Sequence, residues 1–268
     1  KFVRIKDPPV TSSQKWLREQ HEREKLSLMA RGNKEKEDEI RDAKAAKIEK
    51  AKAHAEGLAK QHGVETRAVE CDLSKTDFLE GLRVQTEGLE IGFLVCCAGI
   101  GTNGPFLETP IDSLKRIIQI NAMATLELSY EYARPMAERG KGGIIIIASN
   151  SAYAGSPYVA AYAATKAFDL SLGEALWYEL SEHGIDAMAF SPQGTNTPGL
   201  RRGMTDLKEG EEREGVMMPK DAVAMALSAI GKKASMRADM PEDDNRTRLA
   251  AINRAGNVMK AQAKYTAE

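Results

Sequence analysis

The chain has 268 residues, of which 42% are hydrophobic and 29% charged, a balance that is ordinary for a globular protein and excludes wholesale disorder. Its 38 Lys and Arg nearly cancel its 39 Asp and Glu, so no global field favours nucleic acid or an acidic membrane as a partner. The longest aliphatic run, Ile144–Ala148, is far too short for a membrane span. Three cysteines and four scattered histidines give neither a disulfide framework nor metal-ligand spacing, so we expect a protein of the reducing cytoplasm without a metal.

Strand-like and helix-like patterns alternate along the chain. Alternating or continuous apolar runs predict strands at Lys1–Lys6, Lys25–Arg31, Val64–Cys71, Gly92–Cys97, Gly142–Ala148 and Ala187–Phe190. Helical periodicity or composition predicts helices at Asn33–His62, Leu79–Leu89, Ile111–Arg139, Tyr158–His183 and Thr247–Lys264. This order predicts an α/β fold with one doubly wound parallel sheet and helices on both faces, in three layers, over residues 1–268. Within it, residues 1–24 form an atypical first strand, turn and helix, and residues 237–268 a polar C-terminal tail.

Ligands of such sheets lie outside the carboxyl ends of the strands, and the residues with chemical capability gather there. Tyr162 and Lys166 are four residues apart on a predicted helix, so both project from one face. An ammonium close to a phenol stabilises the phenolate, so such a Tyr can exchange a proton with a carbonyl or alcohol oxygen near neutral pH. This spacing alone is common on helix surfaces.

Two further polar residues accompany this pair. Ser149 directly follows the strand at Gly142–Ala148, where its hydroxyl either points into the cleft or caps a turn. Asn121 lies within an otherwise apolar helix, where it either forms buried hydrogen bonds or faces solvent.

Together these residues resemble the catalytic tetrad of the short-chain dehydrogenase/reductase family, which has a Rossmann-like fold. Cys96-Cys97-Ala98-Gly99 resembles the family's Asn-Asn-Ala-Gly motif, and Ser191–Thr197 resembles its Pro-Gly-x-x-x-Thr loop. Asp72 matches the acidic residue that contacts the adenine ring. The resemblance covers about residues 25–230.

The resemblance implies hydride transfer between a nicotinamide cofactor and a carbonyl or secondary alcohol, with a small molecule as substrate. Tyr162 is then the general acid/base, Lys166 tunes it and binds the ribose, and Ser149 orients the substrate oxygen. Asn121 holds a helix distortion and a water of a proton relay. The cofactor contacts implied are Arg31, Asp72, Leu73, Cys97, Ala98, Gly99, Tyr162, Lys166, Pro192, Thr195 and Thr197. Members of the family usually pair through two long helices, here Ile111–Arg139 and Tyr158–Glu182, so we expect a homodimer or homotetramer.

Two features bear on the cofactor. Arg31 follows the second predicted strand, where an Arg can pair with a 2′-phosphate, so we expect NADP rather than NAD. The first strand should lead into a glycine-rich turn that cradles the diphosphate, yet no glycine precedes Gly32, and Pro8-Pro9 removes two backbone donors. Two hypotheses therefore remain: an NADP-preferring oxidoreductase, or a non-catalytic relative that acts as a structural or regulatory partner. Cys96 and Cys97 replace two asparagines, and we expect both to be buried and structural.

Overall fold

A computed structural model describes residues 39, 42, 45–101, 103–240 and 246–266. The chain divides into two units, residues 1–70 and 71–268. In the first unit, residues 45–62 form a helix, which confirms that part of the helix predicted at 33–62. The strands predicted at 1–6 and 25–31, the atypical segment 1–24 and Arg31 lie outside the described residues.

The second unit contains a parallel sheet. Its described strands, in the order β1-β2-β3-β4, are β1 (Phe93–Cys96), β2 (Gly142–Ile147), β3 (Ile185–Ser191) and β4 (Ser235–Arg237). Each strand pairs in parallel with the next, for example Val95 with Ile145 and Ile145 with Met188. Since parallel neighbours need crossover connections, the intervening segments are helical and cover the sheet. The predicted α/β class with a parallel sheet is confirmed.

The described helices of this unit follow in chain order. They are α2 (Phe78–Thr86), η1 (Phe106–Glu108), α3 (Ile111–Ile118), η2 (Gln119–Met123), α4 (Ala124–Arg139), η3 (Asn150–Tyr153), α5 (Ala160–Ser181), α6 (Pro198–Gly203), α7 (Pro219–Ala229) and α8 (Arg246–Thr266). None of the described helices is long and apolar enough to cross a membrane.

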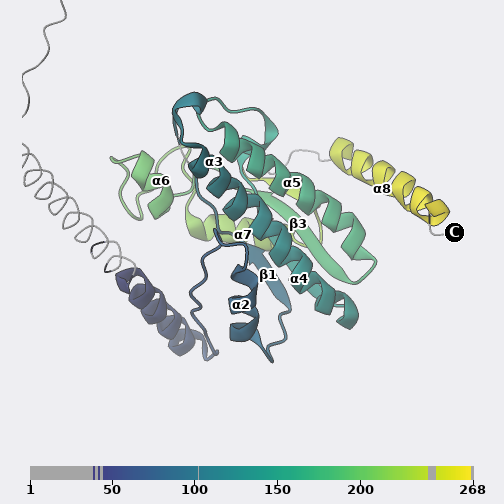
Figure 1. Cartoon of the computed structure of the whole chain (residues 1–268), viewed down its shortest axis with the longest axis horizontal. Helices are drawn as coiled ribbons and strands as arrows, with labels where there is room; N and C mark the ends of the chain where they lie inside the picture. Colours follow the sequence, from purple (N-terminus) through teal and green to yellow (C-terminus); the bar gives the residue numbers. More distant parts are fainter. Residues whose placement is uncertain (1–38, 40–41, 43–44, 102, 241–245, 267–268) are drawn as a thin grey trace, which may run out of the picture. The chain divides into compact units, whose positions relative to one another are not determined.

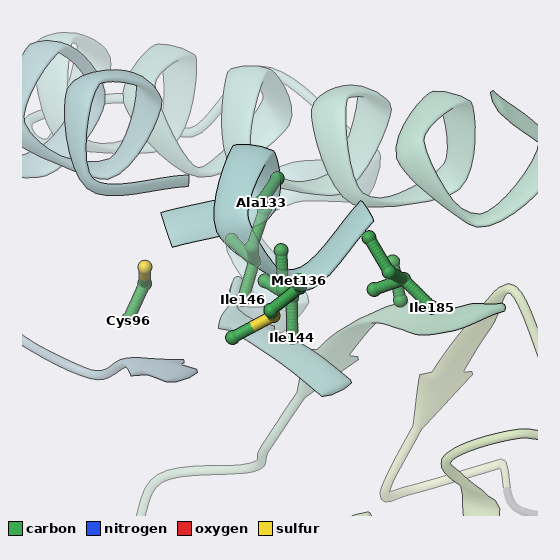
Figure 2. Packing of buried hydrophobic residues seen from close by; sticks show 7 residues of the cluster. Cys96, Ala133, Met136, Ile144, Ile146 and Ile185 are labelled. Carbon is green, nitrogen blue, oxygen red and sulfur yellow. The ribbon is translucent and has the colours of Figure 1, made fainter. Parts of the chain in front are cut away.

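Helices α4 and α5 lie together over one face of the sheet (Figure 1). Ala133 and Met136 of α4 point toward Ile144 and Ile146 of β2 (Figure 2). Because β2 is apolar at every position, it can be buried on both faces, which explains its continuous aliphatic sequence.

The opposite face of the sheet is covered by α7. Ala226 and Ala229 of this helix pack against a cluster that includes Ile145, Met188 and Phe190. The sheet is therefore the middle of three layers. On β1, Phe93 and Val95 alternate with the side chains that meet α4, and they stay 45% and 49% exposed. No described helix covers that part of the sheet.

Helix α5 presses closely on β3, and this contact fixes the element that carries Tyr162 and Lys166. A Cβ on Gly173 would lie 2.8 Å from the Ala189 Cβ and 2.9 Å from the Ala189 backbone N. Only glycine permits this approach, since a side chain there would separate the helix from the sheet. Gly173, about two helical turns after Lys166, therefore fixes the position of α5 along β3.

The structure departs from the predicted elements in several places. Residues 64–71 form no strand, although their pattern predicts one. A strand needs a neighbour for its ladder of hydrogen bonds, and no described residue pairs with this segment, which is mostly exposed. The long helix predicted at Ile111–Arg139 is divided by η2. The short strand β4 and the helices α6 and α7 were not predicted; β4 and α6, with three and six residues, give little periodic signal.

The C-terminal segment contains more structure than the predicted polar tail. Arg237 ends β4, and the helix predicted at 247–264 is confirmed as α8. Arg248 of α8 forms two hydrogen bonds with the buried Glu174 carboxylate of α5, at 2.8 and 2.7 Å. The Tyr178 hydroxyl donates to Asn257 Oδ1 at 2.7 Å. These contacts attach α8 to α5.

Candidate active site

Three loops that leave the carboxyl ends of β1, β2 and β3 carry most of the predicted site residues. They begin at Cys97, Ala148 and Pro192. Because the strands are parallel, these ends lie on one edge of the sheet. The candidate site is therefore at the edge where the topology predicts ligand binding.

Asn121 is fully buried and lies in η2, which is a π-helical turn between α3 and α4. Its Oδ1 accepts a hydrogen bond from the Ile100 N–H, and its Nδ2 donates to the Ile100 carbonyl oxygen, both at 2.9 Å. Nδ2 also donates to Thr165 Oγ1 at 3.1 Å. Of the two possibilities for Asn121, buried hydrogen bonding is the one observed, and the helix is distorted at this residue. The asparagine ties the loop after β1 to α5.

Tyr162 lies in the first turn of α5 and packs over the loop after β1. A Cβ on Gly101 would lie 3.4 Å from Cδ2 of the Tyr162 ring, so the ring lies across the glycine backbone. The side chain is half-buried. The absence of a side chain at Gly101 therefore provides the space that this ring occupies.

Lys166 lies one turn further along α5, and its side chain is only 6% exposed. Its Nζ donates to the Ile147 carbonyl oxygen at 2.7 Å and to Asp169 Oδ2 at 2.9 Å. Burial raises the pKa of the Asp169 carboxyl, and the Lys166 ammonium opposes that rise. A Cβ on Gly99 would lie 3.6 Å from Nζ and 3.6 Å from Asn121 Oδ1. The structure thus brings Gly99, Asn121 and Lys166 together.

Ser149 caps the short helix η3. Its Oγ accepts a hydrogen bond from the Ser151 N–H at 3.2 Å and lies 3.4 Å from Ser151 Oγ. The capping role that the sequence allowed is therefore observed. Neither of these contacts joins Ser149 to Tyr162 or Lys166, although η3 and α5 pack against each other.

The two adjacent cysteines have different environments. Cys96 is buried in the cluster beneath α4, where burial raises the pKa of its thiol to about 11. Its Sγ lies 3.9 Å from Ser129 Oγ. Cys97 is exposed, together with Ala98 and Gly99. The prediction that both cysteines are buried is wrong for Cys97, because β1 ends at Cys96 and the chain turns outward into the loop.

Asp72 lies at the start of the second unit, on an exposed turn. Its carboxylate accepts hydrogen bonds from the Ser74 N–H at 3.1 Å and from the Ser74 hydroxyl at 2.7 Å, which hold the pKa of Asp72 below its ordinary value. Leu73 is half-buried beside it. The described contacts do not join these two residues to Tyr162 or Lys166.

The loop after β3 contains Pro192, Thr195 and Thr197, all half-buried. Thr195 Oγ1 donates to the Gln193 carbonyl oxygen at 2.9 Å, and Thr197 Oγ1 caps α6 by accepting from the Leu200 N–H. The buried Asn196 between them donates to the Lys208 and Glu211 carbonyl oxygens, both at 2.9 Å. The loop therefore has its own fixed structure, and Asn196 organises it.

The nicotinamide half of a dinucleotide fits the residues at this edge. Cys97, Ala98 and Gly99 expose their backbone after β1, and the bare Cα of Gly99 leaves open space beside the Lys166 ammonium. The Lys166 ammonium can donate a hydrogen bond to a ribose hydroxyl, and the exposed loop beside it leaves room for the sugar. In the described part of the chain, no group of three or more His, Cys, Asp or Glu side chains could hold a metal ion.

Sequence reasoning missed Asp169, Thr165 and Asn196. Asp169 lies three residues after Lys166, on the same face of α5, and an acid within a run of small and apolar residues was the available signal. Thr165 bonds to Asn121 and donates to the Tyr162 carbonyl oxygen at 2.8 Å, a contact that residue type alone does not reveal.

Comparisons with known proteins identify relatives of the chain as a whole. The family model for short chain dehydrogenase matches residues 39–207. A 7beta-hydroxysteroid dehydrogenase of Collinsella aerofaciens is 30% identical over 201 residues, which cover 74% of this chain and 75% of that protein.

Two solved structures have the same fold. One, from work on 7beta-hydroxysteroid dehydrogenase stereoselectivity, matches with a TM-score of 0.66 and 26% identity, over 77% of this chain and 84% of that one. The other, a short-chain dehydrogenase from Sphingobium yanoikuyae in complex with NADPH, matches with a TM-score of 0.64 and 26% identity, over 80% and 82%. With the parallel sheet and the Tyr162–Lys166 helix at its carboxyl edge, these matches show that the chain belongs to the short-chain dehydrogenase/reductase family of oxidoreductases.

Proposed function

We propose that this protein is an NADP-preferring oxidoreductase that interconverts a carbonyl and a secondary alcohol, with Tyr162 as general acid/base. The observation that carries the proposal is the cluster of Lys166, Asn121 and Gly99 at the carboxyl edge of the sheet, with Tyr162 one turn before Lys166 on α5. This cluster combines a proton-transfer group, a cation and an open backbone surface. The family and the NADPH complex of a structural neighbour support it.

Each residue has one task in this mechanism. The bound nicotinamide supplies or accepts the hydride. Tyr162 gives its phenolic proton to the carbonyl oxygen during reduction and takes it back during oxidation. The Lys166 ammonium favours the phenolate, and the Ser149 hydroxyl donates to the substrate oxygen once it turns from Ser151. Asn121 fixes the Ile100 backbone, so the loop after β1 keeps its place beside Tyr162.

The remaining cofactor contacts belong to the same proposal. Cys97, Ala98 and Gly99 would hold the nicotinamide ribose, together with Pro192, Thr195 and Thr197. Asp72 and Leu73 contact the adenine. Arg31 pairs with the 2′-phosphate, which is the basis for the preference for NADP. Residues 1–268 then form one nucleotide-binding domain, in line with a family match that crosses residue 70.

For the substrate we infer a bulky, largely apolar alcohol or ketone. The similarity to a 7beta-hydroxysteroid dehydrogenase favours it. An exposed apolar side chain in η1, which follows the loop after β1, also favours it. Phe106 is 61% exposed, as expected of a side chain that a ligand covers.

We also propose that two copies pair through α3, α4 and α5. An apolar stripe runs along one side of these helices at helical spacing, where the side chains of one copy can cover those of another. It consists of Ile111, Ile118, Met123, Leu126, Tyr130 and Phe168, each 37–66% exposed.

A non-catalytic relative is the second candidate function. It is favoured by the lack of any glycine before Gly32 in the sequence. In that case the protein retains the fold but binds no dinucleotide tightly.

Carbonyl reduction by the Tyr162→Phe variant separates these candidates. With a 7-keto steroid and NADPH, turnover by the variant is expected to fall by at least about 100-fold. Tyr132→Phe, which removes a hydroxyl on α4 beside Thr86, is the matched control and is expected to keep wild-type turnover. Unchanged turnover in Tyr162→Phe would exclude Tyr162 as the general acid/base. An absence of NADPH binding in a fluorescence titration of the wild type would support the non-catalytic candidate.

A further inference from the structure

Asp169 is the most buried acid on α5, and among the described residues its ion pair is with Lys166. Its side chain is 1% exposed, and that of Lys166 is 6% exposed. Asp169 Oδ2 accepts from Lys166 Nζ at 2.9 Å, while Oδ1 has no hydrogen-bond donor among the described residues. A buried carboxylate with one unsatisfied oxygen is costly, so its retention in the core requires an explanation.

The ammonium of Lys166 has three N–H donors, and the fold accounts for two of them. One donates to the Ile147 carbonyl oxygen at the end of β2, and one to Asp169. The third has no partner within the described part of the chain. Nζ lies beside Gly99, so this donor faces the surface at which the cofactor ribose is proposed to bind.

We propose that Asp169 is a positioning residue that keeps the Lys166 ammonium charged inside the protein and fixes the direction of its remaining N–H. This inference rests on the proposed function. Without a counter-charge, a buried amine favours its neutral form, which neither stabilises a phenolate nor donates three hydrogen bonds. Ile147 offers a carbonyl dipole but no charge, so the carboxylate is the group that supplies the counter-charge.

Few other charges surround this pair. On β1, Cys96 faces both residues, but burial raises the pKa of its thiol to about 11, so the thiol is neutral at assay pH. From η2 and α4 come Asn121, Thr125 and Ser129, which are uncharged, and β2 contributes backbone. Tyr162 is the titratable neighbour on α5. The charge of Lys166 therefore depends chiefly on Asp169 among the described residues.

The test compares Asp169→Asn, which keeps the side-chain shape but removes the charge, with Glu179→Gln, which removes an exposed charge from the same helix. Carbon NMR of protein labelled with [ε-¹³C]lysine follows the protonation of Lys166, whose signal is assigned by its loss in Lys166→Arg. In Asp169→Asn, Lys166 is expected to lose its proton at a pH lower by about one unit or more. The KM for NADPH is expected to rise about tenfold, with the alkaline limb of the rate profile moving in parallel. Glu179→Gln is expected to match the wild type in all three measurements.

Asp169→Glu keeps the charge and serves as the rescue variant. It is expected to hold the Lys166 titration near the wild-type midpoint while the longer side chain still raises KM. If Asp169→Asn does not fold, Asp169→Glu is the variant compared with the wild type. The inference is overturned if Asp169→Asn lowers only thermal stability, with the Lys166 titration and KM unchanged, or if the Glu variant titrates like the folded Asn variant. A wild-type protein that lacks turnover but shows the expected NMR shift on substitution would contradict the proposed function and leave the role of Asp169 intact.

Discussion

The Asn121 side chain forms two hydrogen bonds with the backbone of a single residue, Ile100, one to its N–H and one to its carbonyl oxygen. One side chain thereby satisfies both polar groups of the Ile100 backbone in the loop after β1. The loop that begins at Cys97 is therefore held by a helix rather than by a neighbouring strand.

The first prediction concerns the stability that this pairing provides. Asn121→Ala removes three hydrogen bonds made by a fully buried side chain, so we expect it to lower the free energy of unfolding by about 3 kcal/mol. Urea denaturation followed by circular dichroism measures the change. Asn257→Ala removes an exposed asparagine that accepts one hydrogen bond, and a loss as large as that of Asn121→Ala would show that burial is not the cause.

A second prediction uses the open space at Gly99. In Gly99→Ala the new methyl would lie 3.6 Å from Lys166 Nζ and from Asn121 Oδ1, which is ordinary contact, so stability is expected to stay within about 1 kcal/mol of the wild type. The methyl would nevertheless occupy the proposed ribose site, and we expect NADPH binding to weaken about tenfold in a fluorescence titration. Gly92→Ala, at the other end of β1, has no atom within 4 Å of its new methyl and is the control. Equal NADPH affinity in Gly99→Ala and Gly92→Ala would show that the ribose does not bind at Gly99.

The adjacent cysteines give a third prediction. At pH 8, iodoacetamide is expected to modify the exposed Cys97 and spare Cys96, whose thiol is buried and has a pKa of about 11. NADPH is expected to slow the modification of Cys97 if the cofactor covers the loop after β1. Peptide mass spectrometry identifies the modified site, and rapid labelling of Cys96 would contradict the burial described here.

The raised pKa of Cys96 also predicts a pH dependence of stability. Between pH 9 and about 11 the unfolded chain loses this thiol proton while the native state keeps it, so stability falls as pH rises through that window. Below pH 9 the thiol does not lower the free energy of unfolding. By about pH 11 its ionisation in the unfolded chain is expected to have lowered that free energy by about 2–3 kcal/mol. Cys96→Ala is expected to show a shallower decline in chemical denaturation across this range. Parallel declines in both proteins would indicate other groups.

A last prediction concerns the attachment of α8. Arg248→Ala leaves the buried Glu174 carboxylate with the hydroxyl of Ser235 as its donor, at 2.6 Å. We expect a loss of about 1–2 kcal/mol, reduced from the value for a fully buried pair because Arg248 is 43% exposed. Amide exchange in residues 248–260 is expected to accelerate. Arg254→Ala changes an exposed residue of the same helix, and faster exchange there to the same degree would show that losing the hydrogen bonds to Glu174 is not the cause.

Residues with a strong local signal could be predicted from the sequence. The aliphatic run that forms β2 favours a strand buried inside a sheet, and Asn121 within an apolar helix stood out as a candidate for buried hydrogen bonding, although a position facing solvent was also open. The strand predicted at Val64–Cys71 shows the limit, since an alternating pattern does not reveal whether another strand lies alongside. Asp169 and Asn196 could not be assigned tasks, because their partners are backbone carbonyls and a lysine that only the fold brings within reach.

The π-helical turn η2 has a consequence for the chain upstream. A wide turn holds one residue more than an α-helical turn, so deleting a single residue between Gln119 and Met123 would let α3 and α4 join into one regular helix. Because the wide turn makes about the same rotation as an α-helical turn with one residue more, the apolar faces of α3 and α4 would stay nearly aligned, and Leu114 and Ile117 would remain inside. The deletion would instead remove the bulge that carries Asn121, and with it the hydrogen bonds to the Ile100 backbone. The extra residue therefore serves the loop after β1 rather than the packing of the helices.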